Sequence, residues 1–238
     1  MALTDSIVAY WKLDEASGTR NDSVGSSHLT DYNTVPSGTG KIGTGVVLPG
    51  STENEYLYCA SNSALEMGDI DFCMCGWYQK TGPTYYATVG KFNSNSTGDY
   101  ILEPNTYNGC KFGVIGSNLQ PVLATDNYAI TMNEWVFLFG WHDSVANQIG
   151  LQVNDRTPVV VSHTLGVAIT STQFMVGAYS DTQYPSQSMS IDEIGIWKRV
   201  LTSDERAALY NSGAGLTYPF SSTAAIPVFM NQYRQRRS

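Results

Sequence analysis

The chain has 238 residues, a formal net charge of −8, and a composition that is 42% hydrophobic and 14% charged. This length fits one large all-β domain or two small domains, and it buries enough surface to fold without disulfides. The acidic balance argues against nucleic acid or an anionic membrane as a partner of the main body. No apolar run approaches the length of a membrane span. The opening "MALTDSIVAYWKLDE" has no basic and apolar leader regions, so we expect a chain made without a secretory signal.

Short segments rich in β-branched and aromatic residues recur along the chain, with turn signals between them. Roughly a dozen strands at such spacing are typical of a β-sandwich. The expected strand segments are 7–13, 45–50, 56–60, 71–80, 85–92, 100–104, 110–116, 134–143, 148–155, 157–163, 173–179 and 190–199.

The segment 134–143 alternates strictly. Every second residue from Trp135 to Trp141 is aromatic, whereas Val136 and Leu138 lie on the other face. Apolar residues on both faces predict a strand in the middle of a sheet that is covered on both sides. The next two segments predict a hairpin that turns at Asn154-Asp155.

One helix is predicted, near the end of the chain. Thr202 is a favourable N-cap, Glu205 completes a capping box, and Gly213 stands where a C′ glycine belongs. The four cysteines predict buried free thiols rather than a metal site. Cys73 and Cys75 share a strand face, where they are poorly placed to pair, and the other two are scattered.

Several segments in order carry a family resemblance. "IVAYWKLDEASGTRNDSVGSSHLT", "GKIGTGVVLPG", "DFCMCGWYQK", "NEWVFLFGWHD", "LQVND" and "SIDEIGIWKRVLTSDERAALYNSG" resemble successive parts of laminin-G-like domains of the concanavalin A-like lectin superfamily. The match covers about residues 3 to 217. It implies an all-β jelly-roll sandwich of two antiparallel sheets with one short C-terminal helix. We expect this domain at 1–220 and an extended C-terminal arm at 221–238. Asn154-Asp155 departs from the common Asn-Gly turn of the family, but both pairs make tight turns.

The resemblance also raises the question of catalysis, because some members of the superfamily hydrolyse glycosides with two glutamates around an aspartate. Retaining hydrolysis needs a nucleophile and an acid about 5–5.5 Å apart. Here Asp69 and Asp71 share a face, but both flanking glutamates are missing. The chain is therefore predicted not to be an enzyme.

Asp192 and Glu193 interrupt the apolar closing segment. On a regular strand they face opposite sides, and Asp192 shares its side with Ile194 and Ile196. Such a carboxylate must be hydrogen-bonded, paired or metal-bound. One interpretation is that it accepts backbone N–H bonds from the turn at 14–25. The alternative, which the calcium-binding members of the family suggest, is a structural calcium held by Asp22 and Asp192.

Tyrosine-rich turns offer candidates for glycan binding, because exposed aromatics stack on sugar faces. The candidates are Tyr85, Tyr86, Tyr179 and Tyr184. Tyrosines in such turns are more often rim-packing residues than recognition residues. Four tryptophans in strands are instead predicted to be core or sheet-packing residues: Trp11, Trp77, Trp135 and Trp197.

Two functions remain for a binding module of this kind. One is a structural virion protein of a bacteriophage, such as a capsid decoration or head-fibre protein, and the other is a carbohydrate-binding lectin domain of a secreted bacterial protein. The missing leader favours the virion, with an extracellular location as the alternative.

The arm at 221–238 differs in character from the body. It has an apolar cluster followed by three arginines and no acidic residue. A frayed terminus is the default for chain ends. The alternative is an assembly element that docks on an acidic neighbouring copy or a capsid subunit through Phe229, Tyr233, Arg234, Arg236 and Arg237.

Overall fold

The structure is a computed structural model and describes residues 1–50, 55–83, 88–93, 97–104, 109–180, 183–185 and 188–220. Almost all regular structure is β. The strands are β1 (Ile7–Trp11), β2 (Thr30–Tyr32), β3 (Ser37–Thr39), β4 (Thr44–Leu48), β5 (Tyr56–Cys59), β6 (Phe72–Lys80), β7 (Val89–Asn93), β8 (Thr97–Glu103), β9 (Cys110–Ile115), β10 (Pro121–Asp126), β11 (Trp135–Asp143), β12 (Gln148–Val153), β13 (Val159–Ser162), β14 (Phe174–Val176), β15 (Ala178–Ser180), β16 (Gln183–Pro185) and β17 (Met189–Trp197). The helices are α1 (Ser203–Tyr210) and the short 3-10 turn η1 (Asn211–Gly213).

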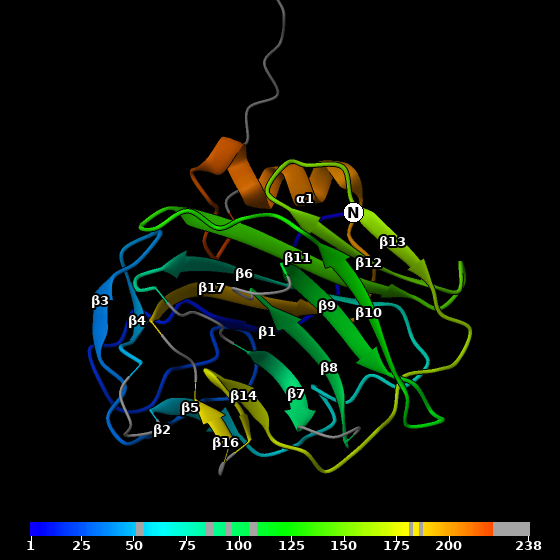
Figure 1. The fold of residues 1–238 in the computed structure, drawn as a ribbon, viewed down its shortest axis with the longest axis horizontal. Coiled ribbons are helices and arrows are strands. Elements are labelled where there is room, and N and C mark those ends of the chain that lie inside the picture. Colours follow the sequence, from blue (N-terminus) through cyan, green and yellow to red (C-terminus); the bar gives the residue numbers. More distant parts are fainter. Residues whose placement is uncertain are drawn as a thin grey trace, which may run out of the picture.

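The strands form two large antiparallel sheets, which confirms the predicted sandwich. The eight-stranded sheet runs β13-β12-β11-β6-β17-β4-β3, and β1 also pairs with β17. The seven-stranded sheet runs β10-β9-β8-β7-β14-β5-β2, and β15 and β16 form a separate ribbon. In Figure 1, β6 and β11 of the first sheet lie above β7, β14 and β5 of the second, and α1 lies above the two sheets.

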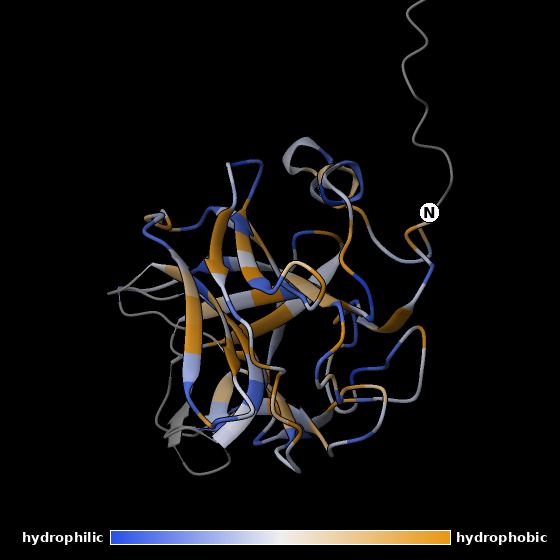
Figure 2. Ribbon diagram, turned by 90° about the vertical axis from the view of Figure 1, so that its right-hand side faces the viewer, coloured by the Kyte–Doolittle hydropathy of each residue, from blue (hydrophilic) through white to orange (hydrophobic). Residues whose placement is uncertain are grey.

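The main core fills the space between the sheets. Alternate residues of each strand point inward, so the inward residues of β11 are Val136 and Leu138 and those of β9 include Phe112 and Val114. The two residues on each strand are fully or almost fully buried. Figure 2 shows the hydrophobic stretches on the strands and mostly polar loops at their ends.

The outer face of the eight-stranded sheet is covered by the C-terminal segment. The aromatic face of β11 predicted from Trp135 to Trp141 packs here, together with Trp77 of β6 and Trp197 of β17. Leu209 of α1 lies in this cluster, and Tyr218 and Phe220 pack against it. The strand prediction for β11 is therefore confirmed, because both of its faces are buried.

The capping box at the start of α1 is confirmed. Thr202 accepts a hydrogen bond from the Glu205 backbone N–H, and the Glu205 side chain accepts one from the Thr202 N–H. The predicted end is one residue too late, because the C-cap is Asn211 and C′ is therefore Ser212 and not Gly213. Asn211 adopts the left-handed conformation (φ 48°) and ends the helix, because asparagine tolerates this region. The hairpin at Asn154 is confirmed, since β12 pairs with β13 and Asn154 has φ 53°.

The closing strand β17 contains a bulge that changes the predicted side of Asp192. Asp192 pairs with Trp77, but the next pair joins Gly195 to Cys75, and Glu193 between them has φ 51°. The extra residue shifts the alternation. Asp192 therefore shares the outer face with Trp77, and the expectation that it lies with Ile194 was wrong.

Candidate functional site

The outer face of the seven-stranded sheet is the candidate functional site. On the opposite side of the molecule, α1 together with Tyr218 and Phe220 covers the eight-stranded sheet. Here the outward residues of β2 and β5 present tyrosines instead. Tyr32 stacks on Tyr56 with ring centroids 4.5 Å apart and planes 15° apart, and Tyr32 is 40% exposed. Tyr56 also packs with Met175 of β14, while Tyr58 borders the same cluster.

A groove lies on the same sheet, over β7 to β10. Its volume is about 90 Å³, and it is lined by Phe92, Ile101, Glu103, Lys111, Leu123 and Tyr179. The strand register explains the lining. Gly113 pairs with Ile101 on one side and with Leu123 on the other, and Glu103 pairs with Lys111 in the next row. A Cβ on Gly113 would lie 2.4 Å from Leu123 Cδ2, so glycine lets Leu123 lean over the sheet.

The charges of the groove sit at one end. The Tyr179 hydroxyl donates a hydrogen bond to Glu103 Oε2, and Lys111 Nζ lies 3.9 Å from Glu103 Oε1. Phe92 packs on Tyr179 with ring centroids 5.7 Å apart. The groove therefore combines apolar walls with a carboxylate and an ammonium group. This combination suits a ligand that has both an apolar face and hydroxyl groups.

The two aspartates considered for hydrolysis, Asp69 and Asp71, do not line the groove. Asp71, one of the two aspartates considered for hydrolysis, accepts hydrogen bonds from the Ser144 backbone N–H and hydroxyl, at 2.9 and 2.7 Å. Asp69 is exposed, next to Gly166 in a loop at the end of the sandwich. A Cβ on Gly166 would lie 2.6 Å from Asp69 Cβ.

The two predicted calcium ligands bind separate backbone segments. Asp22 accepts N–H bonds from Tyr10, Val24 and Ser27, at 3.0 Å each, and so fixes the N-terminal turn. Asp192 accepts N–H bonds from Ile42 at 2.9 Å and Glu193 at 3.0 Å. The turn at 14–25 is thus held by Asp22, whereas Asp192 holds the turn at 40–45. The described part of the chain contains no group of three or more His, Cys, Asp and Glu side chains suited to a metal ion. The calcium site stays a prediction.

Glu193, next to Asp192, points to the C-terminal segment. Tyr10 donates its hydroxyl to Glu193 Oε2 at 2.5 Å and lies 3.2 Å from the Leu216 carbonyl oxygen. Burial raises the pKa of Asp192 to about 8 and that of Glu193 to about 7. Both residues are at most 2% exposed, and their hydrogen bonds are to neighbouring segments of the chain.

Other sequence candidates divide into three groups. Trp11, Trp77 and Trp197 are at most 2% exposed, and Trp135 is half-buried, as expected for packing residues. All four cysteines are buried and free. The side chains of Tyr85, Tyr86 and Tyr184 and the arm residues Phe229, Tyr233, Arg234, Arg236 and Arg237 lie outside the described part of the chain.

The tyrosine-rich turns of the sequence pointed to Tyr179 but not to the rest of this face. Tyr32 and Tyr56 stand 24 positions apart in the sequence. Only the pairing of β2 with β5, which places these two residues opposite each other, brings them together. The alternation of Tyr56 and Tyr58 around a buried leucine was the one local signal, because it indicates an aromatic outward face.

Comparisons with known proteins show the fold. No family model matches the chain, and no curated protein matches it in sequence. Solved structures do match. The binding domain of Paraclostridial Mosquitocidal Protein 1 has a TM-score of 0.71 and 14% identity, over 89% of this chain and 53% of that one. The binding domain of botulinum neurotoxin DC, in complex with SialylT, has a TM-score of 0.65 and 11% identity, over 89% and 52%.

A third structure matches almost over its full length. Domain 4 of AbnA, an extracellular arabinanase from Geobacillus stearothermophilus, in complex with arabinotriose, has a TM-score of 0.60 and 17% identity, over 84% of this chain and 96% of that one. This chain spans about half the length of the two toxin domains. No helix in the described ranges is long and apolar enough to cross a membrane. At these identities the likeness establishes that the chain has the same kind of β-sandwich.

Proposed function

We propose that the chain is a non-enzymatic carbohydrate-binding module and that the outer face of the seven-stranded sheet takes the glycan. The observation that carries this proposal is the stacked pair of Tyr32 and Tyr56, on the same outer sheet face as the groove. The outer ring of the pair, Tyr32, is 40% exposed and lies on the edge strand β2. Aromatic faces pack against the apolar faces of sugar rings, while a polar group such as the Lys111 ammonium bonds to hydroxyls.

Three similarities to other proteins support the proposal. Domain 4 of the arabinanase holds arabinotriose, and the chain resembles laminin-G-like domains of a lectin superfamily. The solved structures named above as binding domains share the same fold. The sugar is to be identified by screening.

The test is a glycan array, followed by calorimetry with the best ligand. The exposed ring makes Tyr32→Ala the informative variant, because its loss should weaken binding by roughly 2- to 10-fold, the equivalent of one aromatic contact. Val160→Ala is the matched control. Val160 is 48% exposed on β13, at the edge of the other sheet. Equal binding by the two variants, or no glycan bound by the native protein, would contradict the proposal.

We propose further that the module is displayed on a bacteriophage virion, as a capsid decoration or head-fibre protein, with the arm at 221–238 as its docking element. The arm carries three arginines, and the whole chain has a net charge of −8, so the arm is complementary to the surface of a neighbouring copy. A chain truncated after residue 220 should bind glycan as before but lose association with particles. Normal incorporation of the truncated chain favours the alternative, an extracellular lectin.

A further inference from the structure

A lysine and an aspartate lie in direct contact inside the sandwich. Lys91 of β7 and Asp99 of β8 each have a fully buried side chain, and Lys91 Nζ lies 2.7 Å from Asp99 Oδ2. The strand pairing explains how they meet. Lys91 pairs with Tyr100, and Phe92 pairs with Gly98, so Asp99 is the extra residue of a bulge. A bulge residue is not paired in the sheet, and its side chain points in a changed direction. Here the Asp99 side chain points at the lysine of the neighbouring strand.

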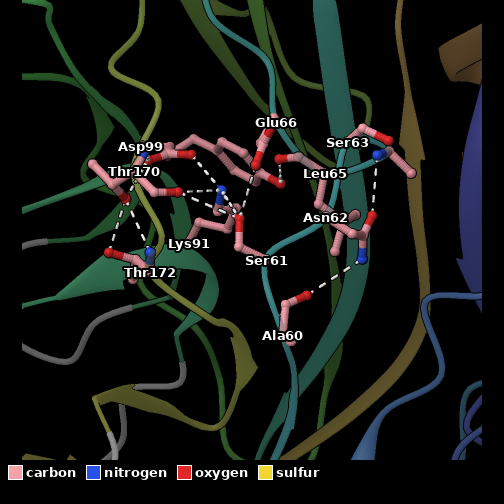
Figure 3. Close-up of polar contacts among 12 residues, drawn as sticks. Ala60, Ser61, Asn62, Ser63, Leu65, Glu66, Lys91, Asp99, Thr170 and Thr172 are labelled. Atoms are coloured by element: carbon pink, nitrogen blue, oxygen red, sulfur yellow. Dashed lines mark hydrogen bonds and ion pairs between the residues drawn. The ribbon is translucent and has the colours of Figure 1, made fainter.

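The two carboxylate oxygens of Asp99 have different hydrogen-bond partners. Thr170 donates its backbone N–H and its hydroxyl to Asp99 Oδ1, at 2.9 and 2.7 Å. Oδ2 accepts no hydrogen bond of ordinary geometry from the described residues, although Lys91 Nζ lies so close. Lys91 Nζ itself donates to Ser61 Oγ at 2.9 Å and to the Thr170 carbonyl oxygen at 3.0 Å. Figure 3 shows these contacts, with Asp99, Lys91 and Ser61 converging from three segments.

We propose that Lys91 and Asp99 condense into an intramolecular isopeptide bond that joins β7 to β8. A bond forms between Lys91 Nζ and Asp99 Cγ, and the bond between Cγ and Oδ2 breaks. Oδ2 leaves as water and takes two of the three ammonium protons, while the third stays on the amide nitrogen. The reaction is a condensation without change of oxidation state, so it needs no oxidant, reductant or further reactant.

The surrounding residues match what this reaction requires. The attack of Nζ on Cγ places negative charge on an oxygen of the tetrahedral intermediate, and the two Thr170 donors already hold Oδ1 in position for it. Nζ must first lose a proton. Its hydrogen bond to Ser61 Oγ continues to Glu66 Oε1, 3.3 Å from that hydroxyl. The Glu66 carboxylate is therefore the proton acceptor, and Ser61 relays the proton to it. The same relay returns the proton to Oδ2 as it leaves as water.

The location of the pair favours condensation over a permanent ion pair. Two charges buried together lose their hydration, and their attraction often fails to offset this cost. Burial also raises the pKa of Asp99 and so favours the neutral carboxyl, whose hydroxyl can leave as water. Because both groups belong to one folded chain, the reaction is intramolecular, and well-oriented groups reach effective molarities of about 10⁵–10⁸ M. The product amide carries no charge.

The first test is the intact mass of the full-length protein under denaturing conditions. We expect a mass lower than that of the sequence by one water molecule, and a branched tryptic peptide that joins the Lys91 and Asp99 segments. Lys91→Arg should restore the full mass. This variant also separates the bond from a succinimide, which would lose water without the lysine. A native mass equal to that of the sequence, or a deficit that persists in Lys91→Arg, overturns the proposal.

The second test follows the rate of bond formation after synthesis in a cell-free system. Glu66→Gln should slow the loss of water and shift the pH profile of the rate, and Glu66→Asp should recover part of it. Glu134→Gln is the matched control, because Glu134 is exposed and lies outside the Lys91 cluster. If Glu66→Gln reacts at the native rate and pH profile, the assigned relay is wrong.

Discussion

The ion pair between Arg199 and Glu205 should stabilise the packing of α1 on the sandwich. Arg199 Nη1 and Nη2 bind Glu205 Oε2 and Oε1 at 2.8 and 2.7 Å. The same guanidinium donates to the carbonyl oxygens of Asp5 and Ala2, so it also holds the N-terminal residues. Glu205 in turn accepts the Thr202 N–H of the capping box. We therefore choose Glu205→Ala as the perturbation.

The expected cost follows from these contacts. Removing one partner of a buried pair costs about 3–5 kcal/mol. Both side chains are about a tenth exposed, so we take the lower value, about 3 kcal/mol. Loss of the capping interaction adds about 1 kcal/mol. Together, about 4 kcal/mol should lower Tm by about 8–16 °C, since a chain of this size loses about 2–4 °C per kcal/mol.

Differential scanning calorimetry measures this shift, and Glu205→Gln separates its parts. Glutamine keeps an acceptor for the Thr202 N–H but removes the charge, so it should be less destabilising than alanine. A double-mutant cycle with Arg199→Met should give a coupling of at least about 1 kcal/mol. A Tm change below 2 °C for Glu205→Ala, on the scale of about 2–4 °C per kcal/mol, would refute the reasoning.

The same pair gives a pH dependence of known sign. The Arg199 guanidinium lowers the pKa of Glu205 from 4.5 to about 2. The stabilisation is therefore complete above pH 4.5 and is lost as pH falls from there toward 2, because only the unfolded chain binds the proton in that window. Glu205→Gln should remove this part of the acid sensitivity.

Three further predictions concern buried groups. Asp192→Ala should lower the free energy of unfolding by about 1–3 kcal/mol, because the Ile42 N–H loses its acceptor. A variant that stays stable but loses ligand binding would give Asp192 a functional role. A rise in the Tm of the native protein with added calcium would support the metal site. Burial and the neighbouring His142 lower the pKa of His163 below 6.5, so stability should fall as pH drops below 6.5, and His163→Gln should lessen this fall in urea titrations. Acrylamide should quench the fluorescence of Trp11 and the other buried tryptophans weakly, and strong quenching of most of them would contradict their placement.

The sequence alone determined those features that depend on neighbouring residues. Alternation along 134–143 predicted a strand buried on both faces, and Thr202 with Glu205 predicted the start of the helix. These signals succeed because a strand repeats every two residues and a cap acts within one turn, so the sequence pattern carries the geometry directly. The one helix-end error, Gly213 in place of Asn211, arose because either residue can adopt the left-handed conformation.

The candidate site was decided by tertiary structure. Asp192 changed faces because Glu193 forms a bulge, and one extra residue reverses every later side chain. Lys91 lies two residues after the apolar Val89 and so shares its strand face, and this spacing indicates that the lysine is buried. Only the pairing of β7 with β8 shows that its partner is Asp99. Which sheet face is open to a ligand depends on where α1 packs, and that contact joins residues far apart in the sequence. Sequence patterns record what a residue does to its neighbours along the chain, whereas strand pairing and sheet covering are set by the free energy of the whole core.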